Sequence, residues 1–375
     1  MLVAVITGPS KKEIEAQIQK ASIHAHALEF RLDCFTDPFN LNDFVLSLRV
    51  IFTLRSISQG GNCQESEEKR LQKIMQLASF HPDFIDLEET VPKSFIEELK
   101  KQYPKIKIIL SYHDFKETPK DLEAVLQRMQ EKKTDFYKMA FYANSSLDAL
   151  QMLQFLKTTE KNVIGLCMGT YGTITRILNH WTFAYVDTPS APGQLSLDEL
   201  VHDYKFSSSK RDSIFGLVGN PVEKSISHIT HNAFFEKKKI NAAYIKMAIK
   251  KEELEQFLQK IKKSDFKGLS VTMPLKEAIL PYLDRIDEKA RAIEAVNTVF
   301  IQDGKLIGSN TDAEGALLAL EEKTTIKNKR VILLGAGGAA KAIAFQAIKK
   351  GAFVTILNRN EEKAVQCAKQ LGCEG

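Results

Sequence analysis

The segment IKIILSYHDFKETPKDLEAVLQRMQEKKTDFYKMA, residues 106–140, contains two β-strand patterns separated by an amphipathic helical pattern. Apolar residues dominate both ends, whereas the central DLEAVLQRMQEK repeats its apolar residues at helical spacing. A strand–helix–strand unit of this kind is typical of α/β folds with a parallel sheet. We therefore expect residues 106–140 to be one unit of a larger parallel sheet.

The same alternation of strand and helix patterns runs through the whole first half of the chain. The predicted strands are VAVIT from Val3, ALEFRLD from Ala27, VIFTLR from Val50, FIDLE from Phe84, IKIILSYH from Ile106, FYKMA from Phe136, NVIGLCM from Asn162 and FAYVD from Phe183. Eight β/α units are what a closed (β/α)8 barrel needs, and an open sheet with the same alternation is the alternative. We expect an N-terminal TIM barrel over residues 1–206.

Composition and charge are those of an ordinary folded protein. Of the 375 residues, 44% are hydrophobic and 26% are charged, which indicates neither disorder nor a coiled coil. The net charge of +5 comes from scattered basic residues, so we expect small anionic ligands and no nucleic-acid partner. Five cysteines without CxxC spacing predict neither disulfides nor a metal site, and they favour the cytoplasm. We expect no signal peptide, because no basic residues precede the short apolar run at the N-terminus. We expect no membrane span, because glycines and Lys341 interrupt the longest apolar stretch.

Polar residues in or just after the predicted strands are the candidates for a ligand site, because a barrel binds its ligand where its strands end. They are Glu29, Arg31 and Asp33 on the second strand, Arg55 on the third, Glu88 on the fourth, His113 on the fifth, Lys138 on the sixth, Arg176 after the seventh, and Ser190 and Gln194 after the eighth. The arginines among them are candidates for binding a carboxylate or hydroxyl groups.

Lys138 lies among apolar neighbours, where a lysine costs free energy unless it snorkels to water or has a chemical role. Burial and surrounding arginines would both lower its pKa and make it a neutral amine that can attack a carbonyl. The resulting imine would activate the adjacent C–H bond, and His113 is the candidate base near neutral pH. We expect Glu88 to orient the His113 ring and to stabilise its charged form.

The motifs EFRLD, TLRS, DLE, SYHDF, YKMA, GTYGTITRI and SAPGQ resemble those of the type I 3-dehydroquinate dehydratases across nearly all of residues 1–205. The resemblance implies a lyase without a cofactor, in which Lys138 forms an imine with the ketone of 3-dehydroquinate. His113 would remove a proton and then help water to leave, giving 3-dehydroshikimate. The implied substrate contacts are Glu29, Arg31, Arg55, Arg176, Ser190 and Gln194. Gln59 stands where many relatives have glutamate, and we leave it outside the predicted site.

A class I aldolase-type barrel fused to a non-catalytic ligand-binding module is the alternative interpretation. Such a barrel also uses a strand lysine, but no clear phosphate loop follows the seventh or eighth strand.

The polar stretch HDYKFSSSKRD separates the two halves of the chain, and we place a linker at residues 207–210. Beyond it, Ser225 and Ser227 precede a helical pattern, where they would either cap the helix or bind a carboxylate. Further polar candidates in this half are Thr272, Lys276, Asn297 and Asp312. A pair such as Lys276 and Asp312 could handle the proton when a ketone is reduced to an alcohol.

The segment VILLGAGGAAKAIA and the following FVTILNRN predict a strand, a glycine-rich loop, a helix and a second strand. In such a loop the backbone can approach a pyrophosphate at the helix N-terminus. The loop residues are Gly335, Ala336, Gly337, Gly338 and Ala339. Asn358, Arg359 and the nearby Lys363 lie where an NAD enzyme usually has an acidic residue. Basic groups there favour the 2′-phosphate of NADP(H) over NAD.

These segments, in this order, resemble shikimate dehydrogenase, and the whole chain resembles the bifunctional enzymes of the shikimate pathway, which leads to chorismate and the aromatic amino acids. The resemblance implies an NADP-dependent oxidoreductase with an α/β substrate-binding domain at 212–314 and a Rossmann-type domain at 315–375. Ser225 and Ser227 would hold the substrate carboxylate, and Lys276 and Asp312 would be the catalytic pair. Thr272 and Asn297 would contact the ring hydroxyls and ketone.

Three features depart from the dehydrogenase pattern. Ser270 stands where many relatives have asparagine, and His228 where many have proline. The family also continues beyond position 375 to complete its nucleotide-binding sheet, so we expect an incomplete Rossmann domain and a crippled or inactive dehydrogenase half. A docking or ligand-sensing module is the non-enzyme alternative for residues 212–375. The oligomeric state stays open.

Overall fold

A computed structural model describes residues 1–160 and 162–375, which form two compact units. The first unit comprises Met1–Arg211 together with Ile229–Ile240, and the second comprises Asp212–His228 and Asn241–Gly375. The division between Arg211 and Asp212 lies directly after the predicted linker.

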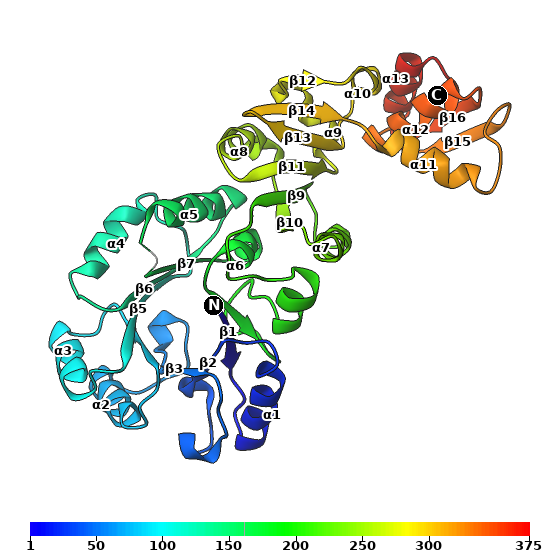
Figure 1. Ribbon diagram of the computed structural model, residues 1–375. Helices are drawn as coiled ribbons and strands as arrows, with labels where there is room; N and C mark the ends of the chain where they lie inside the picture. The colour runs from blue at the N-terminus through cyan, green and yellow to red at the C-terminus, as the bar shows by residue number, and fades with distance from the viewer. Residues whose placement is uncertain (161) are drawn as a thin grey trace. The chain divides into compact units, whose positions relative to one another are not determined.

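The first unit is an eight-stranded parallel sheet that curls into a barrel, as predicted. Its strands are β1 (Leu2–Ile6), β2 (Ala27–Arg31), β3 (Arg49–Thr53), β4 (Phe84–Glu88), β5 (Lys107–Asp114), β6 (Phe136–Tyr142), β7 (Val163–Met168) and β8 (Thr182–Tyr185). They pair in the order β7-β6-β5-β4-β3-β2-β1-β8. The helices are α1 (Lys11–Ala21), α2 (Glu67–Ala78), α3 (Lys93–Gln102), α4 (Leu122–Gln130), α5 (Ser146–Thr158) and α6 (Thr173–Leu178). Figure 1 shows them around the outside of the strands, and all eight predicted strands are confirmed.

Between β7 and β8 side chains take the place of a strand ladder, which is absent there in residues 1–160 and 162–375. The Thr175 hydroxyl accepts a hydrogen bond from the Cys167 backbone N–H at 2.9 Å, and the Asn179 amide donates to the Gly165 carbonyl at 2.6 Å. Buried backbone groups must be paired, so these side chains satisfy the free edge of β7 and leave the barrel nearly closed.

The connection from β2 to β3, all of which the structure describes, contains no α-helix, and a cluster of phenylalanine side chains packs against the strands in its place. Two short 3-10 turns, η1 (Leu32–Cys34) and η2 (Leu41–Asp43), are its regular elements. Phe39 packs edge-on against Phe52 and stacks on Phe44, with ring centroids 5.4 and 6.1 Å apart. Aromatic contacts of this kind cover the outer side of the strands, where the other units use a helix.

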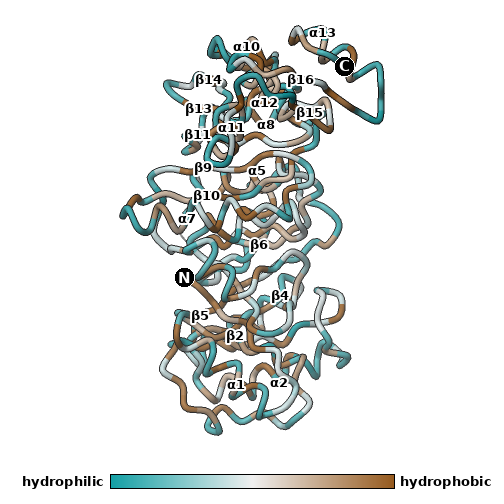
Figure 2. Tube along the Cα trace, turned by 90° about the vertical axis from the view of Figure 1, so that its right-hand side faces the viewer, coloured by the Kyte–Doolittle hydropathy of each residue, from teal (hydrophilic) through white to brown (hydrophobic). Residues whose placement is uncertain are grey.

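The barrel interior has an apolar layer below a polar one. The apolar layer contains Val3, Val5, Ala27, Ile51, Phe84, Ile109, Ile164, Leu166 and Phe183. Figure 2 shows brown, hydrophobic strand segments here, as expected for strands buried on both faces. Above this layer the buried polar residues of neighbouring strands meet, and they are Glu29, Thr53, Asp86, Ser111 and Lys138. Parallel strands align their carboxyl ends, so this polar layer forms the floor of a site.

The second unit has a six-stranded sheet in the order β10-β9-β11-β13-β14-β12. Its strands are β9 (Ser213–Gly219), β10 (Ala242–Ala248), β11 (Phe266–Val271), β12 (Arg285–Ile286), β13 (Thr298–Gln302) and β14 (Lys305–Ser309). The helices along this part of the chain are α7 (Ser227–Lys237), α8 (Leu254–Ile261), α9 (Leu275–Ala278), α10 (Glu288–Ile293) and α11 (Asp312–Glu321). β9 pairs in parallel with β10 and β11, whereas β13 is antiparallel to its neighbours.

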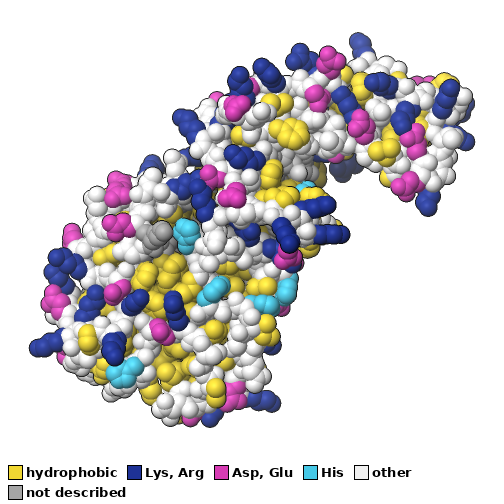
Figure 3. All heavy atoms as spheres, in the orientation of Figure 1, with side chains coloured by type: hydrophobic (Ala, Val, Ile, Leu, Met, Phe, Trp, Pro, Cys, Tyr) yellow, Lys and Arg dark blue, Asp and Glu magenta, His cyan; other side chains and the backbone are white. Residues whose placement is uncertain are grey.

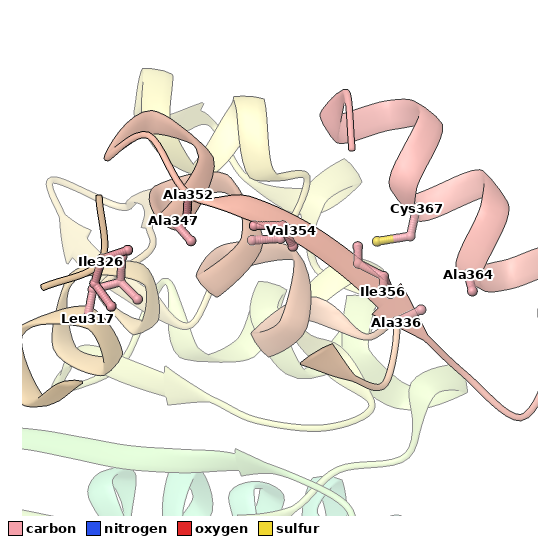
Figure 4. Packing of buried hydrophobic residues seen from close by; sticks show 10 residues of the cluster. Leu317, Ile326, Ala336, Ala347, Ala352, Val354, Ile356, Ala364 and Cys367 are labelled. Carbon is pink, nitrogen blue, oxygen red and sulfur yellow. The ribbon is translucent and has the colours of Figure 1, made fainter. Parts of the chain in front are cut away.

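The last part of the second unit is a β–α–β element followed by a helix. It contains β15 (Arg330–Leu334), α12 (Gly338–Lys349), the parallel strand β16 (Phe353–Leu357) and α13 (Glu361–Leu371). Figure 4 shows its core, in which Val354 and Ile356 of β16 lie among small residues of the helices, including Ala347 and Cys367. The small residues let α12 and α13 pack closely on the strands. The predicted strand–loop–helix–strand is confirmed.

Candidate active site

Lys138 lies in the middle of β6 and is 5% exposed. Its Nζ atom lies 3.1 Å from Asp86 Oδ2 and 3.5 Å from Glu29 Oε1. The Phe183 ring covers the same ammonium, with its centroid 3.9 Å from Nζ. The sequence predicts arginines around Lys138. In the structure, the side chains that pair with its ammonium are the carboxylates of Asp86 and Glu29. Two carboxylates and a ring face stabilise a cation here, and the same contacts would stabilise a protonated imine.

The pocket above Lys138 has about 540 Å³ of empty space, part of it open to solvent. Eight of the ten candidate barrel residues line it, namely Glu29, Arg31, Arg55, His113, Lys138, Arg176, Ser190 and Gln194, whereas Asp33 and Glu88 do not. The wall also includes Gln59, so the expectation that Gln59 lies outside the site is wrong. Phe115, Met168 and Phe183, which the sequence did not single out, line it as well. Strand ends converge in a barrel, which is why residues far apart in the chain meet here.

His113 is held by Gln59. The Gln59 Oε1 atom accepts the His113 backbone N–H at 3.0 Å and lies 3.2 Å from the Nδ1 atom of the ring. A carbonyl oxygen only accepts, so Nδ1 carries the proton and Nε2 is the basic nitrogen. Burial lowers the pKa of His113 well below 6.5, and the charges of Arg55 and Lys138 lower it further. The ring is therefore neutral at pH 7, as a general base must be.

The predicted contact between Glu88 and His113 is wrong. Glu88 ends β4, and its carboxylate accepts hydrogen bonds from the backbone N–H and the hydroxyl of Ser56, at 2.7 and 2.8 Å. The buried guanidinium of Arg70 on α2 lies 3.2 Å from the same carboxylate. These donors hold Glu88 against the segment after β3 and outside the pocket lining. Glu88 therefore supports the backbone next to Arg55.

Asp86, two residues before Glu88, is the carboxylate of β4 that contacts Lys138. Besides Lys138, it pairs with Arg55 at 2.9 Å and accepts the Ser111 hydroxyl at 2.5 Å. Burial raises its pKa, but Arg55 and Lys138 outweigh burial and hold the pKa of Asp86 well below its usual range. Strand alternation puts residues i and i+2 on one face, which is the signal in FIDLE that could have identified it.

Arg176 is 3% exposed and lies on α6. In the described part of the chain its Nε atom has no hydrogen-bond partner, and its Nη2 reaches the Pro192 carbonyl only at 3.5 Å. Burial lowers the pKa of Arg176 to about 10. A buried guanidinium without a counter-ion is favourable only if an anion binds beside it. Arg176 is therefore the strongest candidate for a carboxylate-binding residue in the barrel.

The other pocket residues are fixed by their neighbours. The Thr53 hydroxyl donates to Glu29 at 2.8 Å, Arg31 pairs with Asp33 at 2.8 Å, Arg55 donates to Ser111 at 2.7 Å, and Ser190 donates to Gln194 through its backbone N–H at 2.8 Å. A binding site held in this way loses little conformational entropy when a ligand enters.

In the second unit, Ser225 and Ser227 lie together at the start of α7. Their hydroxyl oxygens are 3.0 Å apart, and Ser225 Oγ also accepts the Ser227 backbone N–H at 3.2 Å. Lys246 of β10 donates to the Ser225 carbonyl at 3.3 Å, which brings a cation beside the pair. The buried Tyr244 ring lies within hydrogen-bond reach of Ser227, and burial raises the pKa of its hydroxyl. Hydroxyls near a cation suit a carboxylate ligand.

Lys276 and Asp312 form an ion pair, and Asn297 donates to the other Asp312 oxygen at 2.7 Å. Asn297 is placed there because its carbonyl accepts the Val271 backbone N–H at 2.7 Å at the end of β11. Thr272 directly follows Val271, and its carbonyl accepts the Leu275 backbone N–H at 2.9 Å, one residue before Lys276. The lysine is one residue into α9, whereas the aspartate starts α11.

The glycine-rich loop lies next to this group. Gly338 starts α12, and a Cβ atom there would lie 3.1 Å from the Cβ atoms of both Lys276 and Ala295. Gly335 has a φ of +122°, and side-chain atoms at Gly335 and Gly337 would meet nothing within 4 Å. The loop therefore leaves space at the N-terminus of a 12-residue helix, which fits a pyrophosphate.

The residues expected at the 2′-phosphate follow β16. Asn358 donates to the Asn360 carbonyl at 3.0 Å, and Asn360 caps α13 by accepting the Lys363 backbone N–H. The Arg359 and Lys363 side chains are exposed. Two free cations near the end of the second strand fit a phosphate better than a neutral ribose.

In residues 1–160 and 162–375, no group of three or more His, Cys, Asp or Glu side chains could hold a metal ion. Over the same residues, no helix is long and apolar enough to cross a membrane. On the face drawn in Figure 3, acidic and basic side chains are interspersed.

Three known families match successive parts of the chain. They are the type I 3-dehydroquinases over residues 2–211, the shikimate dehydrogenase substrate binding domain over residues 217–299, and the shikimate/quinate 5-dehydrogenases over residues 317–374. These matches agree with the resemblance drawn from the motifs and give no support to the aldolase-type alternative.

Curated relatives match the chain across almost its whole length. It is 36% identical to the shikimate biosynthesis protein AroDE of Chlamydia pneumoniae, covering 98% of this chain and 78% of that protein. It is 33% identical to the chloroplastic bifunctional 3-dehydroquinate dehydratase/shikimate dehydrogenase of Arabidopsis thaliana, covering 99% and 67%. The NADP(+) shikimate dehydrogenase of Pyrococcus furiosus is 45% identical over 42% of this chain and 57% of its own length.

Proposed function

Because the chain belongs to the type I 3-dehydroquinase family, and to the bifunctional proteins that join this barrel to a shikimate dehydrogenase, we propose that it catalyses two successive reactions. The barrel dehydrates 3-dehydroquinate to 3-dehydroshikimate, and the second unit reduces 3-dehydroshikimate to shikimate with NADPH. Robust reduction by the full chain would refute the expectation of a crippled or inactive dehydrogenase half. The observation that carries the first assignment is the buried Lys138 at the floor of a pocket shared with the neutral base His113.

The dehydration begins when the Lys138 ammonium gives up a proton and its Nζ attacks the substrate ketone. That proton and a second one from the same nitrogen leave with the carbonyl oxygen as water, which gives a protonated imine. The protonated imine withdraws electrons, so the adjacent C–H bond becomes acidic and His113 Nε2 takes its proton. The cationic ring then gives this proton to the departing hydroxyl group, which leaves as a second water while a C=C bond forms. Hydrolysis of the imine consumes one water, restores Lys138 and releases the product ketone.

Arg176 binds the substrate carboxylate in this proposal. The pocket contains three arginines, but Arg31 and Arg55 already have carboxylate partners in Asp33 and Asp86, whereas Arg176 has none among the described residues. A ligand carboxylate would therefore gain most at Arg176, where it replaces missing hydrogen bonds. Ser190 and Gln194, which also line the pocket, supply further polar contacts.

In the second unit, Lys276 and Asp312 hold and move the proton at the substrate oxygen. Asp312 keeps the ammonium in place, and Asn297 fixes the carboxylate. NADP supplies hydride chemistry when it is bound, and residues 335–339 would hold its pyrophosphate beside Lys276. Ser225 and Ser227 bind the carboxylate of the substrate. Thr272 and Asn297 orient its ring.

The decisive test of the barrel assignment is reductive trapping. The protein is incubated with 3-dehydroquinate and borohydride, which reduces an imine to a stable secondary amine, and the adduct is located by peptide mass spectrometry. We expect one adduct, on Lys138. A folded protein that shows no adduct under these conditions would overturn the assignment.

The cofactor assignment is tested by fluorescence titration with NADPH and NADH. We expect NADPH to bind roughly tenfold or more tightly, because Arg359 and Lys363 can pair with the extra phosphate. Arg359→Ala should weaken NADPH binding while leaving NADH binding unchanged. Equal affinity of the parent for both cofactors would contradict the proposal.

We retain residues 1–206, 212–314 and 315–375 as the proposed domains. We also retain the cytoplasm as the proposed location, supported by the five cysteines, which form no disulfides. Small-molecule substrates, without nucleic acid, remain the proposed partners.

A further inference from the structure

Asp33, to which the proposed mechanism gives no role, lies at the junction of the two strands that carry Arg31 and Arg55. It belongs to η1, directly after β2, and its side chain has no exposed surface. Its carboxylate accepts four hydrogen bonds from nitrogen donors, and the Cys34 thiol is a weak fifth donor with its Sγ atom 3.9 Å from Oδ2. The nitrogen donors are Arg31 Nε and Nη2 at 3.0 and 2.8 Å, the Arg55 backbone N–H at 3.2 Å and the Asn62 backbone N–H at 3.0 Å. The four nitrogen donors match the full accepting capacity of a carboxylate.

We propose that Asp33 is a positioning residue for the dehydration. It fixes the Arg31 guanidinium at the pocket wall and closes the segment that carries Gln59 toward His113. The proposal rests on the proposed function of the barrel and adds a residue that acts through two of its site residues.

The first part of the argument concerns Arg31. Its Nε and Nη2 atoms bind the two oxygens of Asp33 side by side, which is the bidentate arrangement of a guanidinium on a carboxylate. Both N–H groups of Nη1 stay outside this pair, and Arg31 lines the pocket. Burial lowers the pKa of Arg31, but its hydrogen bonds and ion pair with Asp33 more than reverse this effect. Asp33 therefore keeps Arg31 charged and limits its side-chain motion.

The second part concerns the segment from Arg55 to Asn62. Asp33 accepts a backbone N–H from each end of this segment, so one carboxylate holds both ends together. The chain approaches itself closely here, because a Cβ atom on Gly61 would lie 2.3 Å from the Arg55 carbonyl oxygen. Gln59, which binds His113, lies inside the closed segment. A displacement of about 1 Å at such a position can lower a rate by about 100-fold.

The test compares Asp33→Asn with Asp135→Asn in the full chain. Asp135 also accepts a backbone N–H, from Ile108 at 2.9 Å, but it precedes β6 at the opposite end of the barrel. We expect Asp33→Asn to lower kcat/KM for 3-dehydroquinate by about 10- to 100-fold. KM should rise because Arg31 is released, and kcat should fall because Gln59 no longer holds His113 in place. The concentration of 3-dehydroquinate needed for half-maximal trapping on Lys138 should rise with KM. Asp135→Asn should leave kcat, KM and trapping unchanged.

A chemical rescue experiment separates positioning from a merely structural role. In Arg31→Ala, free guanidinium should restore activity several-fold, because Asp33 still offers two oxygens, whereas methylammonium at the same concentration should not. Rescue should disappear in the variant that combines Arg31→Ala with Asp33→Asn. If Asp33→Asn fails to fold, the rescue of Arg31→Ala alone still tests the proposal.

Several outcomes would contradict the proposal that Asp33 is a positioning residue. Unchanged kinetics in a folded Asp33→Asn variant, equal losses in both aspartate variants, or absence of guanidinium rescue would each remove Asp33 from the positioning role. A parent protein that neither traps nor dehydrates 3-dehydroquinate would instead refute the proposed function of the barrel.

Discussion

Lys138 and Lys276 both pair with an aspartate, but their surroundings differ. Lys138 is 5% exposed, lies near two carboxylates and is covered by the Phe183 ring. The side chains of Lys276 and Asp312 are 16% and 27% exposed, and Asn297 is the residue that steadies the aspartate. A lysine that forms a covalent imine needs shielding from water, whereas a lysine that moves a proton needs access to it. The surroundings of each lysine, and not the lysine–aspartate pair itself, therefore distinguish the two proposed roles.

Replacing each lysine should abolish a different reaction. Lys138→Ala removes the nucleophile and should lower dehydration by about 10⁴-fold or more, with complete loss of the trapped adduct. Lys276→Ala removes a proton-handling group and should lower 3-dehydroshikimate reduction by about 10²- to 10⁴-fold. Both rates are measured on the purified full chain by absorbance.

Lys107→Ala is the matched control, because Lys107 is also a strand lysine but begins β5 at the other end of the barrel. It should leave both reactions unchanged. If Lys138→Ala lowered both reactions equally, the two lysines would not belong to separate sites.

The strand pattern was sufficient to predict the barrel and most of its pocket. Inward-facing residues at strand ends converge whatever the loops do, so Lys138, His113 and Arg176 could be assigned from their positions along the chain. Glu88 could not be assigned correctly, because strand periodicity gives the face of a side chain but not its partner. Ser56 and Arg70 decide that partner, and both depend on how the segment after β3 folds.

The contact between Gln59 and His113 could not be predicted from the sequence either. Gln59 lies four residues beyond Arg55, outside any strand, and reaches His113 only because Gly60 adopts a φ of +77° and Gly61 allows close backbone approach. The glycine pair is a turn signal in the sequence, but it does not say which residue the turn presents.

The same substitution at the two aspartates should have unequal effects on stability. Asp86→Asn leaves two buried cations, Lys138 and Arg55, without their shared carboxylate, and should lower the free energy of unfolding by about 3–5 kcal/mol. Asp312→Asn acts on a partly exposed pair and should lower it by no more than about 1 kcal/mol. Urea denaturation monitored by circular dichroism measures both. Equal losses would show that burial does not distinguish the two pairs.

Gln59→Glu should shift the pH dependence of kcat/KM for dehydration. A general base works only when neutral, so kcat/KM falls as the pH drops through the pKa of His113. With Gln59 that pKa lies well below 6.5, and the profile should be flat down to pH 6.5. The introduced carboxylate would stabilise the imidazolium and raise the pKa by about 1–3 units, shifting the acid limb upward.

Gln76→Glu adds the same charge on an exposed position of α2 and is the control. Its profile should overlay that of the parent. An unshifted acid limb in Gln59→Glu would mean that His113 is not the titrating base.

Arg176→Met should separate substrate binding from stability in the barrel pocket. Arg176 has a pKa of about 10, so it is charged at pH 7, and its burial without a counter-ion penalises the folded state there. Removing the charge should raise the free energy of unfolding by about 1–2 kcal/mol while KM for 3-dehydroquinate rises. Arg128→Met, at an exposed arginine paired with Glu89, should not stabilise the protein. Substrate should raise the melting temperature of the parent but not that of Arg176→Met, because the stabilisation requires a carboxylate beside this guanidinium. A destabilised variant that still binds substrate would show that Arg176 serves the fold, and the pocket would then need another carboxylate partner.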